Sequence, residues 1–136
     1  MKKQIEQVKE FHKSFNIPIL KTPQLPNVQR CDLRQNILEE EVRELRDAMN
    51  LGDIVLTADA IIDCMYVLIG TAHEFGLADM LEQCFDAVHR SNMSKLGADG
   101  RVVLRADGKV LKSSNYFKPN LSKILNFDSQ TSQIKK

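Results

Sequence analysis

The sequence has few of the residues that mark secreted, disulfide-bonded proteins. Its 136 residues include three cysteines, and no two of them form a Cys-X-X-Cys pair. An odd number of scattered cysteines does not predict a disulfide framework, so Cys31, Cys64 and Cys84 favour a reducing compartment. We therefore predict a cytoplasmic protein.

Motifs of several other protein classes are also missing. The first ten residues lack the apolar segment of a signal peptide, and the longest uncharged run, residues 64–73, is much shorter than a bilayer span. Neither GxxxxGK[ST] nor GxGxxG occurs, which excludes a P-loop and a Rossmann nucleotide site. The three histidines have no HxxxH spacing and Cys64 has no nearby histidine, so a zinc site or a Cys–His nucleophile is not expected. We also expect no membrane partner.

The net charge is small, but the charges are unevenly distributed along the chain. Nineteen Lys and Arg residues balance 18 Asp and Glu residues, and the resulting +1 does not predict a nucleic-acid-binding protein. Residues 47–88 contain no Lys or Arg and eight acidic residues. From residue 97 onward there are eight basic and three acidic residues. The sequence thus combines an acidic middle, suited to a cation, with a basic end, suited to an anion.

The spacing of apolar residues predicts four helices. Apolar side chains recur every three or four residues, and Pro18, Gly52 and Gly76 mark where helices end. The predicted helices cover residues 2–15, 28–50, 53–75 and 78–95. The third is apolar on nearly all sides, so we expect it to be the central and most buried helix. The predicted fold class is therefore all-α, a mostly antiparallel bundle of four to five helices.

A basic arm follows the predicted helices. Within residues 97–125, two Ala-Asp-Gly turn signals bracket the apolar run at 102–104, which predicts a short ribbon and not a second domain. We expect residues 1–125 to form one domain, because a chain of this length can bury a continuous core. Residues 126–136 show no periodicity and are predicted to be a flexible tail.

Three glutamates lie close together on the second predicted helix. Glu40 and Glu44 are four residues apart and Glu41 and Glu44 are three apart, which stacks their carboxylates on one helix face. A solvated acidic face, balanced by Arg43 and Arg46, has the same pattern and is common. The glutamates alone therefore leave a metal site and a solvated surface as alternatives.

Two aspartates interrupt the apolar third helix. Asp59 and Asp63 are also four residues apart, and that helix contains no Lys or Arg to pair with them. Packing it against the glutamate helix would bring four or five carboxylates into one pocket, where a hard cation relieves their repulsion. All-oxygen ligands favour Mg²⁺ or Mn²⁺ over zinc. The alternative is that basic side chains from the tail or from another subunit pair with the two aspartates.

The basic arm supplies groups that bind phosphate. Magnesium held by carboxylates recruits substrate phosphates, and Lys95, Lys109 and Lys112 can neutralise the phosphate oxygens that the metal leaves uncovered. Tyr66 in the third helix is ordinarily a core residue, yet its hydroxyl needs a polar partner and can face the pocket. These residues predict metal-assisted chemistry on a phosphorylated substrate.

The acidic residues resemble those of the MazG-like all-α nucleoside triphosphate pyrophosphohydrolases, a superfamily that includes phosphoribosyl-ATP pyrophosphohydrolase. The family pattern is EExxE followed downstream by ExxD, and residues 40–44 supply the first half. Asp63 matches the family aspartate. Ala60 stands where the family has a glutamate, and Asp59 is the nearest acid. The resemblance therefore covers the metal motif with one departure.

Longer segments carry a finer resemblance. VHRSNMSK at residues 88–95 and DGKVLK at 107–112 are similar to the dimeric, dUTP-hydrolysing branch of the MazG-like enzymes, and YVLIGTA at 66–72 also fits. Together with Phe11 and His12, the similarity covers most of residues 5–125. EExxE alone has low specificity, whereas the ordered set of segments is specific.

The resemblance implies hydrolysis between the α- and β-phosphates of a nucleoside triphosphate, which gives the monophosphate and pyrophosphate with Mg²⁺ as cofactor. Similar proteins are house-cleaning enzymes that remove non-standard or surplus nucleotides. The implied metal ligands are Glu40, Glu41, Glu44 and Asp63, with Asp59 as the substitute for the missing glutamate. Glu41 would orient or deprotonate the attacking water, and Asn92, Lys95 and Lys112 would contact the nucleotide.

Two other functions stay open at this stage. A phosphoribosyl-ATP pyrophosphohydrolase has the same metal motif, although the segments after residue 88 resemble the other branch. A helical oligomer that binds nucleotides without hydrolysing them is consistent with Ala60 in place of the family glutamate. In every case the very apolar third helix needs more cover than three neighbours provide, so we predict a homodimer or a higher homo-oligomer.

Overall fold

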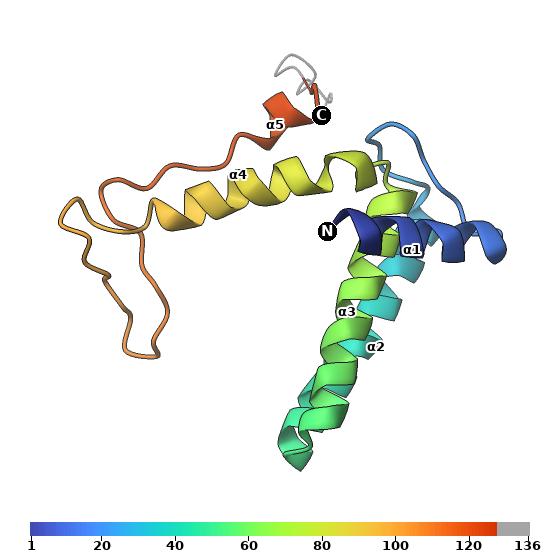
Figure 1. Cartoon of the computed structure of the whole chain (residues 1–136), viewed down its shortest axis with the longest axis horizontal. Coiled ribbons are helices and arrows are strands. Elements are labelled where there is room, and N and C mark those ends of the chain that lie inside the picture. Colours follow the sequence, from blue (N-terminus) through green and yellow to red (C-terminus); the bar gives the residue numbers. More distant parts are fainter. Residues whose placement is uncertain (128–136) are drawn as a thin grey trace. The chain divides into compact units, whose positions relative to one another are not determined.

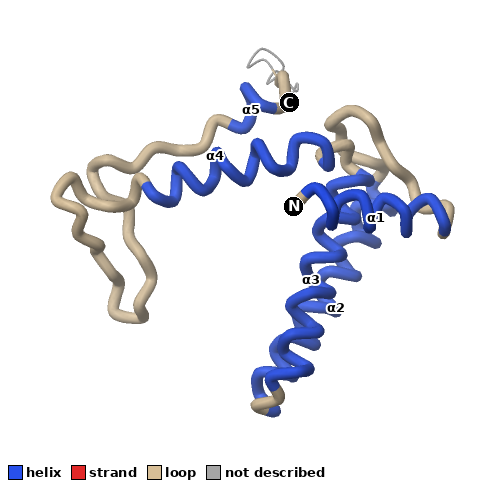
Figure 2. The backbone as a smooth tube through the Cα atoms, viewed as in Figure 1, coloured by secondary structure: helices blue, strands red, loops and turns tan. Residues whose placement is uncertain are grey.

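The structure is a computed structural model that describes residues 1–127, and it is helical (Figures 1 and 2). The elements are α1 (Lys2–Ser14), α2 (Val28–Leu51), α3 (Ile54–Glu74), the 3-10 helix η1 (Ala78–Met80), α4 (Leu81–Met93) and α5 (Leu121–Ile124). No β-strand occurs among the described residues, so the predicted all-α class is confirmed. Most of the tail predicted at residues 126–136 lies outside the described part of the chain.

The chain divides into two compact units, which are described separately. The first unit is Met1–Asp79 and the second is Met80–Lys136. The boundary falls inside the fourth predicted helix, at residues 78–95, which the structure divides into the short η1 and the regular helix α4. The first three predicted helices agree with α1, α2 and α3 to within one residue at each end. The short helix α5 was not predicted, since four residues carry no helical periodicity.

Two long antiparallel helices form the body of the first unit. The Asn27 side chain caps α2 by accepting a hydrogen bond from the Arg30 amide, and Gly52 ends this helix in the left-handed conformation at φ 69°. Asp53 immediately caps α3 by accepting hydrogen bonds from the amides of Val55 and Leu56. Since only two residues separate α2 from α3, the helices run in opposite directions side by side (Figure 1).

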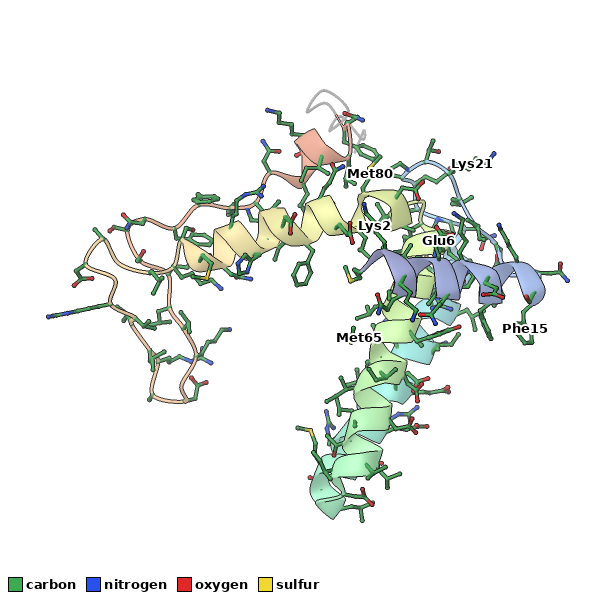
Figure 3. The ribbon with its side chains drawn as sticks, in the orientation of Figure 1. Lys2, Glu6, Phe15, Lys21, Met65 and Met80 are labelled. Atoms are coloured by element: carbon green, nitrogen blue, oxygen red, sulfur yellow. The ribbon has the colours of Figure 1, made fainter. Side chains whose placement is uncertain are left out.

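Helix α1 packs across the C-terminal end of α3 (Figure 1). Its buried residues Ile5, Val8 and His12 follow the predicted apolar stripe. Phe11 and Phe15 belong to the same stripe but are exposed, and Figure 3 shows Phe15 at the far end of the helix. Helix α1 therefore buries a narrower face than its sequence predicts.

Helix α3 has more buried residues than any other helix within residues 1–127, as predicted, but most of this burial lies at one end. Its buried residues are concentrated in the C-terminal half, from Ile69 to Glu74, while Ile54 is 77% exposed and Ile62 57% exposed. The physical reason is that α2 covers one side of α3 along its length, whereas α1 adds cover only at one end. The N-terminal half of α3 thus presents apolar side chains without cover from the described residues of its own unit.

Helix α3 is also the one helix in the described part of the chain that is long and apolar enough to cross a membrane. Only 17% of the apolar window is buried. Length and composition are weak support for a membrane span, because the central helix of a water-soluble protein passes the same test. Asp59 and Asp63 lie within this helix.

The second unit consists of α4, the predicted ribbon and α5. Leu104 and Val110 form an antiparallel bridge, and the Leu111 amide donates to the Val103 carbonyl at 2.8 Å. The turn between them contains Gly108 at φ 85°, a conformation that favours glycine. The ribbon-like arm is therefore confirmed as one short hairpin. Helix α5 packs against α4.

Candidate active site

Glu41 is the glutamate of the EExxE segment that faces α3. It lies seven residues from Arg34 and seven from Ala48, the two buried residues of α2, and seven residues are close to two helical turns. All three therefore share the face that packs on α3, and Glu41 is half-buried. Glu40 and Glu44 flank this face and are exposed.

Asp63 on α3 is the acidic residue that acts most strongly on Glu41. Burial raises the pKa of Glu41, and the negative charges of Asp63, Glu44 and Glu40 raise it further, in that order. Burial and the charges of Glu41 and Asp63 likewise raise the pKa of the Cys64 thiol. The two helices thus bring four carboxylates into electrostatic range of one another, with Glu41 in the middle.

Asp59 is placed differently from Asp63. It is exposed on α3, and its charge is not among those that raise the pKa of Glu41. Ala60, at the position of the family glutamate, is only 5% exposed within the packed helices. The predicted substitution of Asp59 for the missing glutamate stays a prediction.

The carboxylates suit a hard divalent cation in their chemistry, although their side chains do not converge. All four donors are oxygen atoms of acidic residues, the ligands that Mg²⁺ and Mn²⁺ prefer. Within residues 1–127, no group of three or more His, Cys, Asp or Glu side chains is positioned to hold a metal ion. Glu40 instead borders a hollow on the outer side of α2 together with Arg43 and Arg46. Glu40 and Glu44 are exposed, so their side chains are free to rotate. They would have to rotate toward Glu41 and Asp63 for all four carboxylates to bind one cation.

Tyr66 belongs to an aromatic group that joins α1 and α3. Its ring lies 5.6 Å from the ring of Phe11 in an edge-to-face arrangement, and the Phe11 and Phe15 rings are 4.4 Å apart. Tyr66 follows Asp63 by three residues, so the two side chains are neighbours on the helix surface. Phe11 and Phe15 are 38% and 65% exposed, so this aromatic group lies at the surface.

The other predicted substrate-binding residues belong to the second unit. The Lys95 ammonium donates to the Asn92 side-chain oxygen at 2.8 Å. Lys112 lies over the ring of Tyr116, with its Nζ 4.5 Å from the ring centre. Lys109 lies at the ribbon turn, where its amide donates to the Asp107 carboxylate at 3.2 Å. Asn92, Lys95, Lys109 and Lys112 were predicted to contact the substrate, whereas their partners Tyr116 and Asp107 were not.

A network of buried charged side chains joins α2 and α3 at the end of the pair where α1 crosses. Glu74 is 1% exposed and pairs with Arg30, whose Nη2 donates to the Glu74 Oε1 at 2.9 Å, and with Arg34, whose Nη1 lies 3.5 Å away. Arg34 also donates to the Thr71 hydroxyl at 3.1 Å and to the Val67 carbonyl. The sequence motifs did not predict this network, although Arg34 within the apolar stripe of α2 is a signal of it.

Two histidines complete the network. The rings of His12 and His73 lie 5.6 Å apart, and a His73 ring nitrogen is 2.9 Å from the Ile5 carbonyl oxygen. Burial lowers the pKa of His12, while its contact with the Pro18 carbonyl raises it in part. Both histidines are 2% exposed, so both pack into the interior of the first unit.

The chain is similar to a known protein family. The family model described as phosphoribosyl-ATP pyrophosphohydrolase matches residues 8–92, which is more than half of the chain. The matched segment includes α2, α3 and the four carboxylates around Glu41, but it ends before Lys95 and the ribbon. No curated protein matches the chain.

Proposed function

Because the chain belongs to the phosphoribosyl-ATP pyrophosphohydrolase family, we propose that it hydrolyses the α–β phosphoanhydride bond of a nucleoside triphosphate. The products are the nucleoside monophosphate and pyrophosphate. The observation that carries the proposal is the half-buried Glu41, whose pKa is raised by burial and, beyond that, by the neighbouring charges of Asp63, Glu44 and Glu40. The resemblance of residues 88–95 and 107–112 to the dUTP-hydrolysing branch favours the triphosphate over phosphoribosyl-ATP.

The proposed cofactor is Mg²⁺, with Mn²⁺ as the alternative. Its ligands are proposed to be Glu40, Glu41, Glu44 and Asp63, with Asp59 as a further ligand. When bound, the cation supplies Lewis acidity at phosphoryl oxygens and neutralises their charge. The carboxylates contribute the negative charge that makes the site selective for a divalent cation.

Glu41 is the proposed general base. Its carboxylate oxygen accepts a proton from the attacking water, which travels in line with the bond to the leaving pyrophosphate. Burial and like charge make this carboxylate hold a proton more readily than an exposed glutamate, which is the property that a base requires. Tyr66, next to Asp63 on the helix surface, is proposed to border the nucleotide.

The proposed contacts to the phosphates come from Asn92, Lys95, Lys109 and Lys112. Their ammonium and amide groups are the donors that phosphate oxygens accept. This assignment is supported by the similarity of the segments that contain them. It is tested by alanine variants, which are expected to raise KM more than they lower kcat, because phosphate binding precedes the chemical step.

The decisive experiment uses a panel of nucleoside and deoxynucleoside triphosphates. The protein is incubated with each nucleotide and Mg²⁺, and the products are separated by anion-exchange chromatography. We expect pyrophosphate and monophosphate in equal amounts, and no reaction when the divalent cation is removed with EDTA. Release of orthophosphate, or the absence of turnover on every nucleotide, contradicts the proposal.

A second candidate substrate is phosphoribosyl-ATP itself. The family match favours it, since the matching model carries that description. The same assay with phosphoribosyl-ATP separates the two, because only one substrate should reach a high kcat/KM. If nucleotides bind in the presence of Mg²⁺ without any hydrolysis, the chain is instead a nucleotide-binding module, for which Ala60 in place of a glutamate is the sequence signal.

We further propose that the protein is cytoplasmic and forms a homodimer or a higher homo-oligomer. The three cysteines are free, as a reducing compartment favours. The uncovered side of α3 includes Ile61, Ile62 and Met65, and Figure 3 shows Met65 on this helix. A second copy of the chain presents the same apolar side, so pairing around a twofold axis would bury both.

A further inference from the structure

The second unit contains a pocket that the proposed hydrolysis does not use. It has a volume of about 660 Å³ and lies between α4 and residues 117–126. Arg90, Lys118 and Lys123 line it, and no acidic side chain does so among the described residues. None of the ion pairs found in the described part of the chain involves these three cations. The charged side chains that line the pocket are therefore all positive.

Internal hydrogen bonds hold one wall of this pocket in place. The buried Ser91 donates from its hydroxyl to the Phe117 carbonyl at 2.7 Å, and the Phe117 amide donates to the Ser94 hydroxyl at 3.1 Å. Ser113 donates to the Leu96 carbonyl at 3.0 Å. These bonds tie residues 113–117 to the end of α4, so the pocket is formed without a ligand.

The pocket lies on a different face of α4 from the predicted substrate residues. Gln83, Ala87 and Arg90 line the pocket and recur at intervals of four and three residues, so they share one face of the helix. Asn92 is two residues after Arg90, which turns it to the other side of the helix. Its side chain there accepts the hydrogen bond from Lys95. The two groups of polar residues are thus separate sites.

The chemistry of the pocket matches a nucleoside phosphate. Arg90, Lys118 and Lys123 provide charge for phosphate oxygens, with the guanidinium able to bind two oxygens at once. Phe117 lines the pocket and is 52% exposed, so it offers a face on which a base can stack. Asn120 and Asn126 add amide groups that can bond to a base or sugar.

We propose that this pocket is a second nucleotide site, which binds a nucleoside phosphate by its phosphates and its base without a divalent cation. The three cations replace the charge neutralisation that a metal ion provides elsewhere. The volume falls in the range of pockets that hold small-molecule ligands. All residues of this site belong to the second unit, so the inference can be tested independently of the proposed hydrolysis.

The test is a binding titration in EDTA. The probe is an ATP analogue with a methylene group between the α- and β-phosphates, which a pyrophosphohydrolase cannot cleave, and binding is followed by calorimetry on the full chain. We expect one site per chain. The double variant Arg90→Gln/Lys123→Gln should weaken binding by at least about tenfold, because it removes two of the three cations. The matched control Arg101→Gln/Arg105→Gln removes two exposed cations of the same unit that line neither site, and it should bind like the wild type.

Two further measurements make the result specific. Phe117→Ala should weaken binding of the analogue but leave binding of inorganic pyrophosphate unchanged, since pyrophosphate has no base to stack. Backbone amide NMR shifts of residues 117–126 in the wild type should move on titration, which requires no variant to fold. Circular dichroism confirms that each variant keeps its helices.

Three results would overturn the inference. The first is that the analogue does not bind in EDTA, and the second is that the control variant, and not the Arg90 and Lys123 variant, loses binding. The third is that a single-stranded oligonucleotide binds much more tightly than the analogue through the same residues, which would make the pocket part of a nucleic-acid surface. Pyrophosphate release in Mg²⁺, assayed in parallel, reports separately on the proposed hydrolysis.

Discussion

At the scale of single residues, the difference among the three glutamates comes from which face of α2 each occupies. Glu41 lies on the buried side of α2 with Arg34 and Ala48. Burial raises its pKa, and the negative charge of Asp63 on α3 raises it further. Glu40 and Glu44 flank the buried side. Glu40 and Glu41 are adjacent in the sequence, yet only Glu41 is placed to act as a base, because the two side chains point to different sides of the helix.

The variant Glu41→Gln tests this role. We expect kcat to fall by at least about a hundredfold, because a positioned general base contributes that much or more, while the helical fold is retained. The matched control is Glu39→Gln on the same helix, where Glu39 is exposed and accepts a hydrogen bond from Gln35 at 2.9 Å. Steady-state kinetics with pyrophosphate detection measures both. Wild-type rates in Glu41→Gln would show that the base lies elsewhere.

The buried Glu74 should be one of the most sensitive positions for stability. Glu74→Ala leaves Arg34, with 9% of its side chain exposed, without its carboxylate, and we expect a loss of about 3–5 kcal/mol in the free energy of unfolding. Glu6→Ala removes the exposed pair between Glu6 and Lys9 and should cost less than about 1 kcal/mol. Urea unfolding measures both variants, and equal losses would contradict the importance of the network.

His12 should make the first unit less stable in mild acid. Burial lowers its folded-state pKa, so the unfolded chain binds a proton more readily, and the free energy of unfolding falls as the pH drops below about 6.5. One proton limits the slope to about 1.4 kcal/mol per pH unit. Glu74 opposes this shift, whereas His73 and Arg34 reinforce it.

Unfolding measured between pH 7 and pH 5 checks the prediction. His12→Asn should flatten the pH dependence, because asparagine does not titrate. His89→Asn, at an exposed position of α4, is the control and should leave the slope unchanged. The prediction is wrong if both variants have the wild-type slope.

At the scale of secondary-structure elements, two glycines that end helices have the same backbone conformation but different surroundings. Gly52 follows α2 at φ 69°, and Gly76 follows α3 at φ 68°. A methyl group on Gly52 would meet no atom within 4 Å, whereas on Gly76 it would lie 2.0 Å from the Thr22 carbonyl oxygen. The connector between α1 and α2 thus packs directly on the end of α3.

The pair Gly76→Ala and Gly52→Ala separates backbone strain from packing. Both variants force alanine into the left-handed region, which costs about 1–2 kcal/mol. Gly76→Ala must also displace the connector backbone, so we expect it to lose at least about 2 kcal/mol more than Gly52→Ala. Thermal or urea unfolding of the two variants gives the difference, and equal losses would show that the connector does not need this contact.

At the scale of the whole molecule, many apolar side chains of α3 are not covered by the rest of its own unit. Ile61, Met65 and Leu68 recur at intervals of four and three residues, so they share one side of the helix, and they are 44%, 44% and 51% exposed. Contiguous apolar surface of this kind usually marks an interface. A second copy of the chain is the partner that we propose for it.

Light scattering at micromolar concentration tests the assembly. We expect at least twice the 15.5 kDa mass of one chain. Ile62→Lys places a charge on the uncovered side of α3 and should shift the mass toward one chain, because burying an unpaired charge is costly. Leu25→Lys, at an exposed position of the connector, is the control and should leave the mass unchanged. A wild-type protein with the mass of one chain would contradict the proposal.

The sequence by itself determined the helices, the ribbon and the group of acidic residues. Helix boundaries follow from local causes, such as the Asp53 cap and the glycine that ends α2, so they are visible in the order of residues. Turn signals predicted the hairpin for the same reason. The EExxE segment and Asp63 likewise identified the superfamily, which includes the phosphoribosyl-ATP pyrophosphohydrolase family matched over residues 8–92, whereas the resemblance to the dUTP-hydrolysing branch stays a prediction.

Only the tertiary structure decided which of these residues meet. Glu41 opposite Asp63, and Glu74 between two arginines, join positions far apart in the chain, and such pairs depend on the register in which helices pack. The extent of cover on α3 depends in the same way on how many neighbours reach it. Periodicity shows that a face is apolar, but what lies against that face is decided by three-dimensional packing.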